Sequence, residues 1–183
     1  GCNLGGLVNT ALDGVAGQEA TVAAEIVKYA GSDLLCYRAE RPDGLVARQS
    51  ALWDPVLESS SRRLGCRFAV ASGLMPVAQA PEVAAAFAGA VDGLAPLPLA
   101  ALHVLTTLTG SALLALAVLE GRMTLAAAWA AAHVDEDWQI AEWGEDEEAK
   151  ARRARRLVEA RAAATLITLV REAGATLQAG SHA

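Results

Sequence analysis

The spacing of hydrophobic residues has a helical period along most of the chain. In residues 10–30, Val22, Ile26 and either Tyr29 or Ala30 recur with helical spacing, which places them on one face of a helix, and Gly31 ends the segment. Similar segments predict further helices over residues 81–91, 98–120, 125–143 and 145–173, which end at Asp92-Gly93, Gly121, Gly144 and Gly174. Most of the chain is therefore expected to be helical.

The first part of the chain mixes helix with short extended segments. Asp54 and Pro55 predict the N-cap and first residue of a helix that ends at Gly65. Residues 32–38 (SDLLCYR) and 66–71 (CRFAVA) are short and apolar, and we interpret them as strands. Two such strands do not make a stable sheet by themselves, so they either pair with strands outside this chain or lie against the helices.

Residues 94–119 form a run of 26 residues without Asp, Glu, Lys or Arg. As a helix this run would be about 39 Å long, enough to cross the roughly 30 Å core of a bilayer. Prolines at its start, a polar cluster around His103 and the lack of aromatic or basic flanks favour instead the central helix of a bundle. We therefore expect no stable membrane insertion. The overall prediction is a mainly α fold, with a small α/β part over residues 1–76 and a helical bundle over residues 77–183.

Composition and charge narrow the possible functions. Hydrophobic residues make up 54% of the chain but only 4% are aromatic, so alanine supplies much of the apolar content and favours closely packed helices. The net charge of −6 argues against nucleic-acid binding, which needs a basic surface. The three cysteines are an odd number without a CxxC pair, which favours a reducing compartment over a disulfide framework or a structural zinc site.

Charge is concentrated towards the C-terminus. Residues 135–148 contain eight acids and no Lys or Arg, and residues 150–161 contain six bases against one acid. Ion pairs at i,i+4 and the dipole of the last helix account for the acids from residue 145 onwards. They do not account for Asp135, Glu136 and Asp137, which lie late in the predicted 125–143 helix, where the helix dipole disfavours acids.

Two tryptophans share this acidic segment, and their role has two interpretations. Trp138 and Trp143 can be core residues in a chain that has few bulky side chains. Alternatively, they can belong to a protein interface, where tryptophan is enriched and the neighbouring acids steer a basic partner.

Sequence motifs for catalysis are missing. No GxGxxG, GxxxxGK[ST], GxSxG or HExxH occurs, so the sequence offers no phosphate-binding loop and no common hydrolase motif. His133 and Asp137 are the only potential metal ligands of that segment at i,i+4, and a second histidine would have to be His103. An enzyme that uses His133 and its neighbouring carboxylates is the alternative function.

Several longer strings together resemble a known family. They are NTALDG (9–14), YAGSDLLCYRA (29–39), WDP (53–55), AHVDEDWQ (132–139) and WGED (143–146), in this order. These strings are similar to those of the assembly chaperones of mitochondrial and α-proteobacterial ATP synthase that hold the α subunit of the catalytic head. Members of that family have a β-rich portion before the NTALDG helix, so the chain is expected to be truncated and its two short strands to have lost their partners.

The resemblance implies a chaperone that binds the unassembled α subunit, in the bacterial cytoplasm or the mitochondrial matrix. It needs no ATP hydrolysis, cofactor, metal or small-molecule substrate. The expected partner-binding residues are the acids and tryptophans of the C-terminal segment: Asp135, Glu136, Asp137, Trp138, Glu142, Trp143, Glu145 and Asp146. A second set is expected to be structural: Asp33, Arg38, Trp53 and Asp54. In it, Asp33 is expected to form a cap or to pair with a basic group such as Arg38.

Overall fold

Helices dominate the computed structural model, which describes the backbone of residues 13–180 and the side chains of residues 13–174. In chain order the elements are α2 (Glu19–Gly31), η1 (Leu34–Cys36), β1 (Tyr37–Arg38), α3 (Asp43–Leu64), β2 (Ala71–Ser72), α4 (Pro81–Val91), α5 (Pro96–Thr109), α6 (Ala112–Leu119), α7 (Leu125–Ala132), α8 (Val134–Trp143) and α9 (Glu147–Gly180). This arrangement confirms the predicted mainly α fold.

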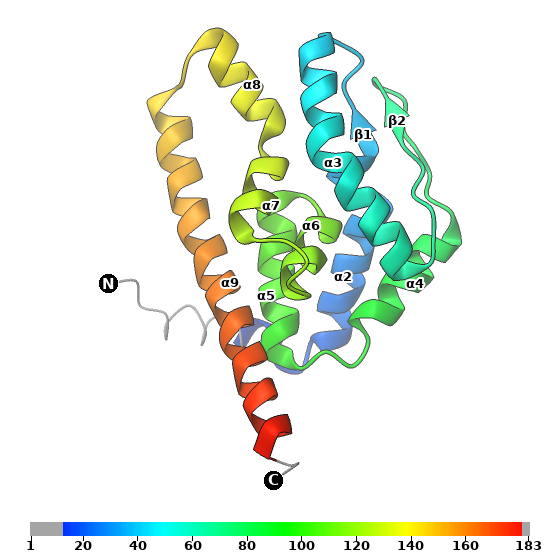
Figure 1. Cartoon of the computed structure of the whole chain (residues 1–183), viewed down its shortest axis with the longest axis vertical. Helices are drawn as coiled ribbons and strands as arrows, with labels where there is room; N and C mark the ends of the chain where they lie inside the picture. The colour runs from blue at the N-terminus through cyan, green and yellow to red at the C-terminus, as the bar shows by residue number, and fades with distance from the viewer. Residues whose placement is uncertain (1–12, 181–183) are drawn as a thin grey trace.

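The centre of the bundle is formed by α5 and α6 (Figure 1). Helix α5 packs against α9, α6 and α2, and α3 lies against α6 and α8. Every residue of α6 from Ala112 to Val118 is buried, so this helix is apolar on all sides, as the centre of a bundle requires. Within the part of the chain that the structure describes, no helix is long and apolar enough to cross a membrane.

Two predicted long helices are each divided in two. Instead of one helix over 98–120, α5 ends at Gly110, which adopts a left-handed φ of 70°, and α6 begins after the N-cap Ser111. The predicted 125–143 helix is interrupted at His133, which separates α7 from α8. Hydrophobic periodicity continues across both breaks, so it did not reveal them.

Other predicted boundaries also differ. Helix α2 begins only at Glu19, because Gly17 adopts a φ of 78° that interrupts the predicted helix; residues 10–12 lie outside the described residues. Helix α3 begins at Asp43, so Asp54 is not an N-cap and Pro55 lies inside the helix. Helix α9 begins at Glu147, two residues late, and continues past Gly174. By contrast, α4 has the predicted bounds.

The extended segments are shorter than predicted. Within 32–38, the Asp33 carboxylate accepts a hydrogen bond from the backbone N–H of Leu35, which turns the chain into η1 and leaves two residues for β1. Within 66–71 only residue 71 belongs to a strand. The side-chain amide of Gln79 instead pairs with Ala69: its oxygen accepts from the Ala69 N–H at 2.9 Å, and its nitrogen donates to the Ala69 backbone oxygen at 2.7 Å. The two strands pair in parallel, Tyr37 with Ala71 and Arg38 with Ser72.

The predicted division at residue 76 stays a prediction. One hydrophobic core contains residues from both sides of that position, among them Ile26 and Trp53 before it and Leu102 and Leu113 after it.

The central position of α6 predicts a large effect of truncating its side chains. Leu114→Ala should lower the free energy of unfolding by about 2–5 kcal/mol, because the fully buried leucine leaves a cavity. Leu169→Ala in α9, where the leucine is 50% exposed, should cost less than about 1 kcal/mol. Urea denaturation followed by circular dichroism measures both, and equal losses would contradict the central role of α6.

Candidate functional site

Asp33 lies fully buried where α2, α5 and α6 meet, and it caps the start of α6. Its carboxylate accepts hydrogen bonds from the Ser111 hydroxyl at 2.7 Å and from the backbone N–H groups of Leu113 and Leu35, both at 3.1 Å. Ser111 in turn accepts from the N–H of Leu114. Two orphan donors of the α6 N-terminus are thus satisfied: the Leu113 N–H by Asp33, 80 residues earlier in the chain, and the Leu114 N–H by the N-cap Ser111.

Two opposing effects act on the Asp33 carboxyl. Burial disfavours its charged form and raises its pKa to about 6, from an ordinary 3.8, while the hydrogen bonds from Ser111, Leu113 and Leu35 work in the opposite direction. The net result is a carboxyl group that binds a proton more readily in the folded protein than in the unfolded chain.

Arg38 does not pair with Asp33 as the sequence suggested; its partner is Asp54. The Arg38 guanidinium donates to the Asp54 carboxylate at 2.7 Å and to the backbone oxygen of Leu35 at 3.0 Å. It also lies 5.1 Å from the centre of the Trp53 ring. Trp53 is buried, and its indole N–H donates to the backbone oxygen of Ala131 at 2.7 Å. These contacts join the segments that carry the four residues, and Asp33 accepts from the Leu35 N–H at the start of η1. The structural role of the set stays a prediction.

Gln49 connects this cluster to the acidic segment. Its side-chain oxygen accepts from the backbone N–H of Ala39 at 2.8 Å, and its side-chain nitrogen donates to the Asp135 carboxylate at 2.7 Å. The residue is 1% exposed. Sequence reasoning missed Gln49; the available signal was a polar residue four positions before Trp53, on the buried face of the same helix.

His133 forms the junction between α7 and α8. Its Nδ1 lies 2.8 Å from the backbone oxygen of Trp129, and its ring centre is 4.2 Å from a ring of Trp129. Burial lowers the pKa of His133 and favours the neutral ring. The break at this residue puts Asp135, Glu136 and Asp137 in the first turn of α8, where the helix dipole favours acids. The expectation that these acids sit late in a helix was wrong.

The first half of α8 is attached to α3 and α9. Asp137 is paired with Arg153 of α9. Trp138 is partly buried against the start of α3: a Cβ atom at Gly44 would lie 2.6 Å from Cη2 of Trp138, and the Arg48 guanidinium lies 5.0 Å from the centre of the indole. Glu136 is partly buried. Trp138 therefore packs against α3 but lies outside the hydrophobic core, so both interpretations of its role stay predictions.

The end of α8 and the turn into α9 face solvent. Trp143 is 88% exposed. Glu142, Glu145 and Asp146 around it are exposed, with Glu145 3.1 Å from the Lys150 ammonium and Asp146 accepting from the N–H of Ala149 as a helix cap. We call these residues the acidic tip: Glu142, Trp143, Glu145 and Asp146. We call the other four predicted binding residues the inner group: Asp135, Glu136, Asp137 and Trp138. Three of them contact α3 or α9, although Asp135 is itself exposed.

Potential metal ligands do not cluster in residues 13–174. No three His, Cys, Asp or Glu side chains there lie close enough together to hold a metal ion. His103, proposed as a second ligand beside His133, instead contacts Glu25 at 2.9 Å.

Comparisons with known proteins place the chain in a class. A family model described as ATP12 chaperone protein matches residues 2–61. The Atu1473 protein of Agrobacterium tumefaciens, described as a candidate chaperone, is 52% identical and superimposes with a TM-score of 0.83, over 88% of this chain and 61% of that one. Atp12 of Paracoccus denitrificans is 40% identical, with a TM-score of 0.83 over 88% of this chain and 69% of that one. A mutant of the Paracoccus protein gives a TM-score of 0.85.

The fold is therefore that of a group of proteins described as chaperones. This chain belongs to the ATP12 chaperone family. It spans 61% of the length of the Agrobacterium protein.

The raised pKa of Asp33 predicts an unusual pH dependence. Because the folded-state pKa of about 6 exceeds the ordinary 3.8, the folded protein takes up a proton before the unfolded chain does, so this group adds stability as the pH falls from about 7 to about 4. Relative to Asp33→Asn, which cannot titrate, the wild type should gain about 2–3 kcal/mol over that range. Urea denaturation at a series of pH values measures the difference. A gain in the opposite direction would show that the hydrogen bonds outweigh burial.

The contact between Gly44 and Trp138 predicts a position-specific effect of alanine. Gly44→Ala should lower the free energy of unfolding by about 1–3 kcal/mol, because the new methyl group overlaps the indole. Gly89→Ala is the matched control: it lies within α4 with nothing within 4 Å, and should raise stability by up to about 1 kcal/mol. Thermal melts of both variants test this, and a harmless Gly44→Ala would mean that Trp138 is free to move.

Proposed function

We propose that the protein is an ATP-independent assembly chaperone that binds the unassembled α subunit of ATP synthase and prevents its aggregation before it joins the β subunit. Membership of the ATP12 chaperone family supports the chaperone role. The motifs shared with chaperones that hold the α subunit support the choice of client. The proposed compartment is the bacterial cytoplasm, or the mitochondrial matrix in a eukaryote, where ATP synthase subunits assemble.

The observation that carries the proposal is the exposed tryptophan of the acidic tip. A tryptophan that is 88% exposed leaves a large apolar surface in water, and nothing within the described residues covers it. Tryptophan is among the residues that contribute most to binding energy at protein interfaces. A partner that covers Trp143 would offset this unfavourable exposure.

The acids around Trp143 favour a basic partner surface. Charges at the rim of an interface chiefly set the rate of encounter and the choice of partner. A chaperone must also release its client, so a small apolar contact with a charged rim suits the task better than a large apolar interface. Binding only the unassembled subunit then stabilises that subunit by mass action.

The inner group supports the acidic tip mechanically. Asp135 bonded to Gln49, Asp137 paired with Arg153, and Trp138 packed on Gly44 attach α8 to α3 and α9. We therefore propose that Asp135, Glu136, Asp137 and Trp138 contribute to client binding mainly by fixing the direction of α8. Direct contact is assigned to the acidic tip.

Charge reversal at the acidic tip tests the site. Glu142→Lys combined with Glu145→Lys should weaken capture of the isolated α subunit by at least about tenfold, because both lysines would repel a basic surface. The matched control, Glu82→Lys with Asp92→Lys, makes the same change of net charge at exposed positions of α4 and its C-cap. Affinities come from co-purification and titration with purified α subunit.

The same assay tests the choice of client. The wild-type chain should capture isolated α subunit and not isolated β subunit. Equal weakening by both double variants would refute the acidic tip as the binding site, and absence of α capture by the wild type would refute the proposed function. Circular dichroism of each variant confirms that the fold is kept.

An enzyme acting through His133 is not favoured by the geometry. The Nδ1 of His133 contacts a backbone oxygen, and the nearby carboxylates of Asp135 and Asp137 are engaged by Gln49 and Arg153. These contacts account for the residues as parts of the α3–α8–α9 junction.

A further inference from the structure

A second surface feature lies far from the acidic tip, beside the C-terminal half of α9. It is a half-open cleft of about 320 Å³ between that half of α9 and the ends of α3, α4 and α6. Arg171, one of its lining residues, is 24 residues beyond the start of α9 at Glu147, which corresponds to about 36 Å of helix.

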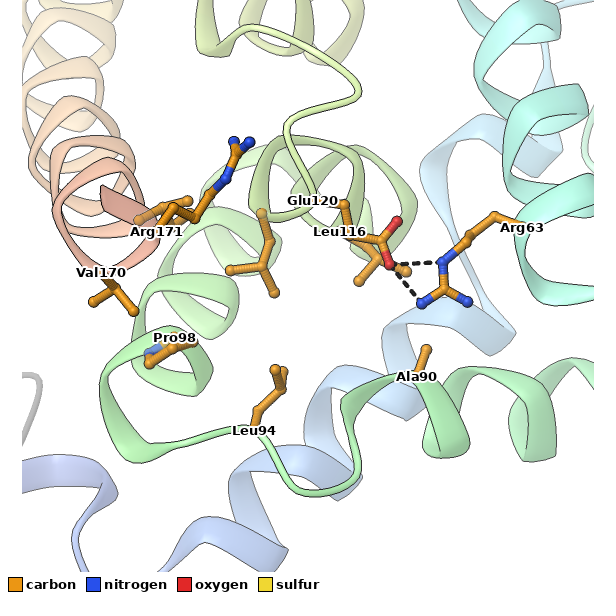
Figure 2. A pocket seen from close by; sticks show the side chains of 10 residues that line it. Arg63, Ala90, Leu94, Pro98, Leu116, Glu120, Val170 and Arg171 are labelled. Atoms are coloured by element: carbon orange, nitrogen blue, oxygen red, sulfur yellow. Dashed lines mark hydrogen bonds and ion pairs between the residues drawn. The ribbon is translucent and has the colours of Figure 1, made fainter. Parts of the chain in front are cut away.

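The floor of the cleft is apolar. Its lining includes Leu94, Leu116, Leu119, Ile167 and Val170. Of these, Leu94, Leu119 and Val170 are partly exposed. Figure 2 shows Leu94 and Pro98 below the gap, and Arg171 and Arg63 on opposite sides of it. An apolar side chain from a partner would therefore meet carbon at the bottom of the cleft, with Arg171 on one side and the ion pair of Arg63 and Glu120 on the other.

The charged residues that line the cleft are Arg63, Arg171 and Glu120, two cations and one anion. Glu120 accepts from Arg63, with a closest approach of 2.8 Å, and from Arg122 at 2.7 Å, so two arginines share one carboxylate. Arg171 is exposed and has no ion-pair partner among residues 13–174. The rim is thus short of a carboxylate, in a protein whose net charge is −6.

The turn after α6 limits where the Arg171 side chain can lie. Gly121 adopts a left-handed φ of 69°, and a Cβ atom there would lie 2.2 Å from a terminal nitrogen of Arg171. The guanidinium therefore lies directly against the backbone of Gly121. At any residue other than glycine, the side chain would occupy that space. This close packing holds the charge at the edge of the apolar floor.

We propose that this cleft is a second docking site for the client, and that it takes a segment in which an apolar side chain stands next to a carboxylate. The apolar side chain fills the cleft, and the carboxylate pairs with Arg171. The identity of the partner rests on the proposed function. The cleft would bind the client through a basic residue, whereas the acidic tip would bind it through carboxylates.

The shape of the cleft favours a polypeptide segment over a free small molecule. A free ligand is held by burying most of its surface, and a half-open cleft at the small end of the usual size range cannot do this. A segment of a client that is already bound at the acidic tip needs only to insert one side chain, because tethering raises its effective concentration. Two sites of opposite charge would also fix the orientation of the client, since a client turned end to end would meet like charges.

Charge reversal at Arg171 tests the docking site. Arg171→Glu should weaken binding of the isolated α subunit by at least about tenfold, because it replaces the attraction for a carboxylate by repulsion. Arg161→Glu is the matched control: it makes the same charge change at another exposed position of α9 and should alter the affinity by less than about threefold. Arg171→Lys, which keeps the charge, should retain most of the affinity. Circular dichroism verifies that all variants remain folded.

Hydrogen exchange on the wild-type complex gives an independent measurement. Backbone amides of residues 116–122 and 167–171 should exchange more slowly when the α subunit is bound. Equal affinities for Arg171→Glu and Arg161→Glu, or unchanged exchange at the cleft in a complex that protects residues 142–146, would overturn the docking site and leave the proposed function standing. Failure of the wild type to bind the α subunit would instead refute the proposed function, and with it the occupant assigned to the cleft.

Discussion

The buried carboxylate of Asp33 is the interaction on which the centre of the bundle depends. Helix α6 is apolar throughout and buried, so its first N–H groups cannot donate hydrogen bonds to water. They must find acceptors inside the protein. Asp33 and Ser111 supply those acceptors. These acceptors offset the cost of ending α5 at Gly110 inside the protein. Helix α6 can therefore cross the interior as a separate helix.

The position of α6 in turn determines how the outer helices pack. It lies against α5 and α3, and α3 carries Gln49 and Trp53, whose side chains reach Asp135 and Ala131. The same chain of contacts therefore leads from the core to α8 and to the direction in which the acidic tip points. A polar network of this kind fixes one geometry strongly, because each unsatisfied buried group would be costly. That property suits a protein whose proposed binding residues stand at the end of a short helix.

Local patterns in the sequence predicted the mainly α fold and the bounds of α4, but they did not predict the helix breaks. Periodicity continues across Gly110 and His133, and the breaks depend on partners distant in sequence: Asp33 for the first, and the packing of α8 on α3 for the second. Likewise, Asp54 resembles an N-cap when only its neighbours are considered, whereas its role is to pair with Arg38. The candidate binding segment was recognisable from charge and tryptophan content. Its division into Trp138, packed against α3, and Trp143, exposed, required the tertiary arrangement.

The hydrogen bonds of the Gln79 side chain bear on self-association of the protein through its extended segments. It bonds to both backbone groups of Ala69, two residues before β2, so neither group is left free to pair with another extended segment. An open strand edge can recruit extended segments from other chains and seed aggregates. For a chaperone such recruitment would be especially costly, and the side chain of Gln79 leaves no unpaired backbone group at Ala69.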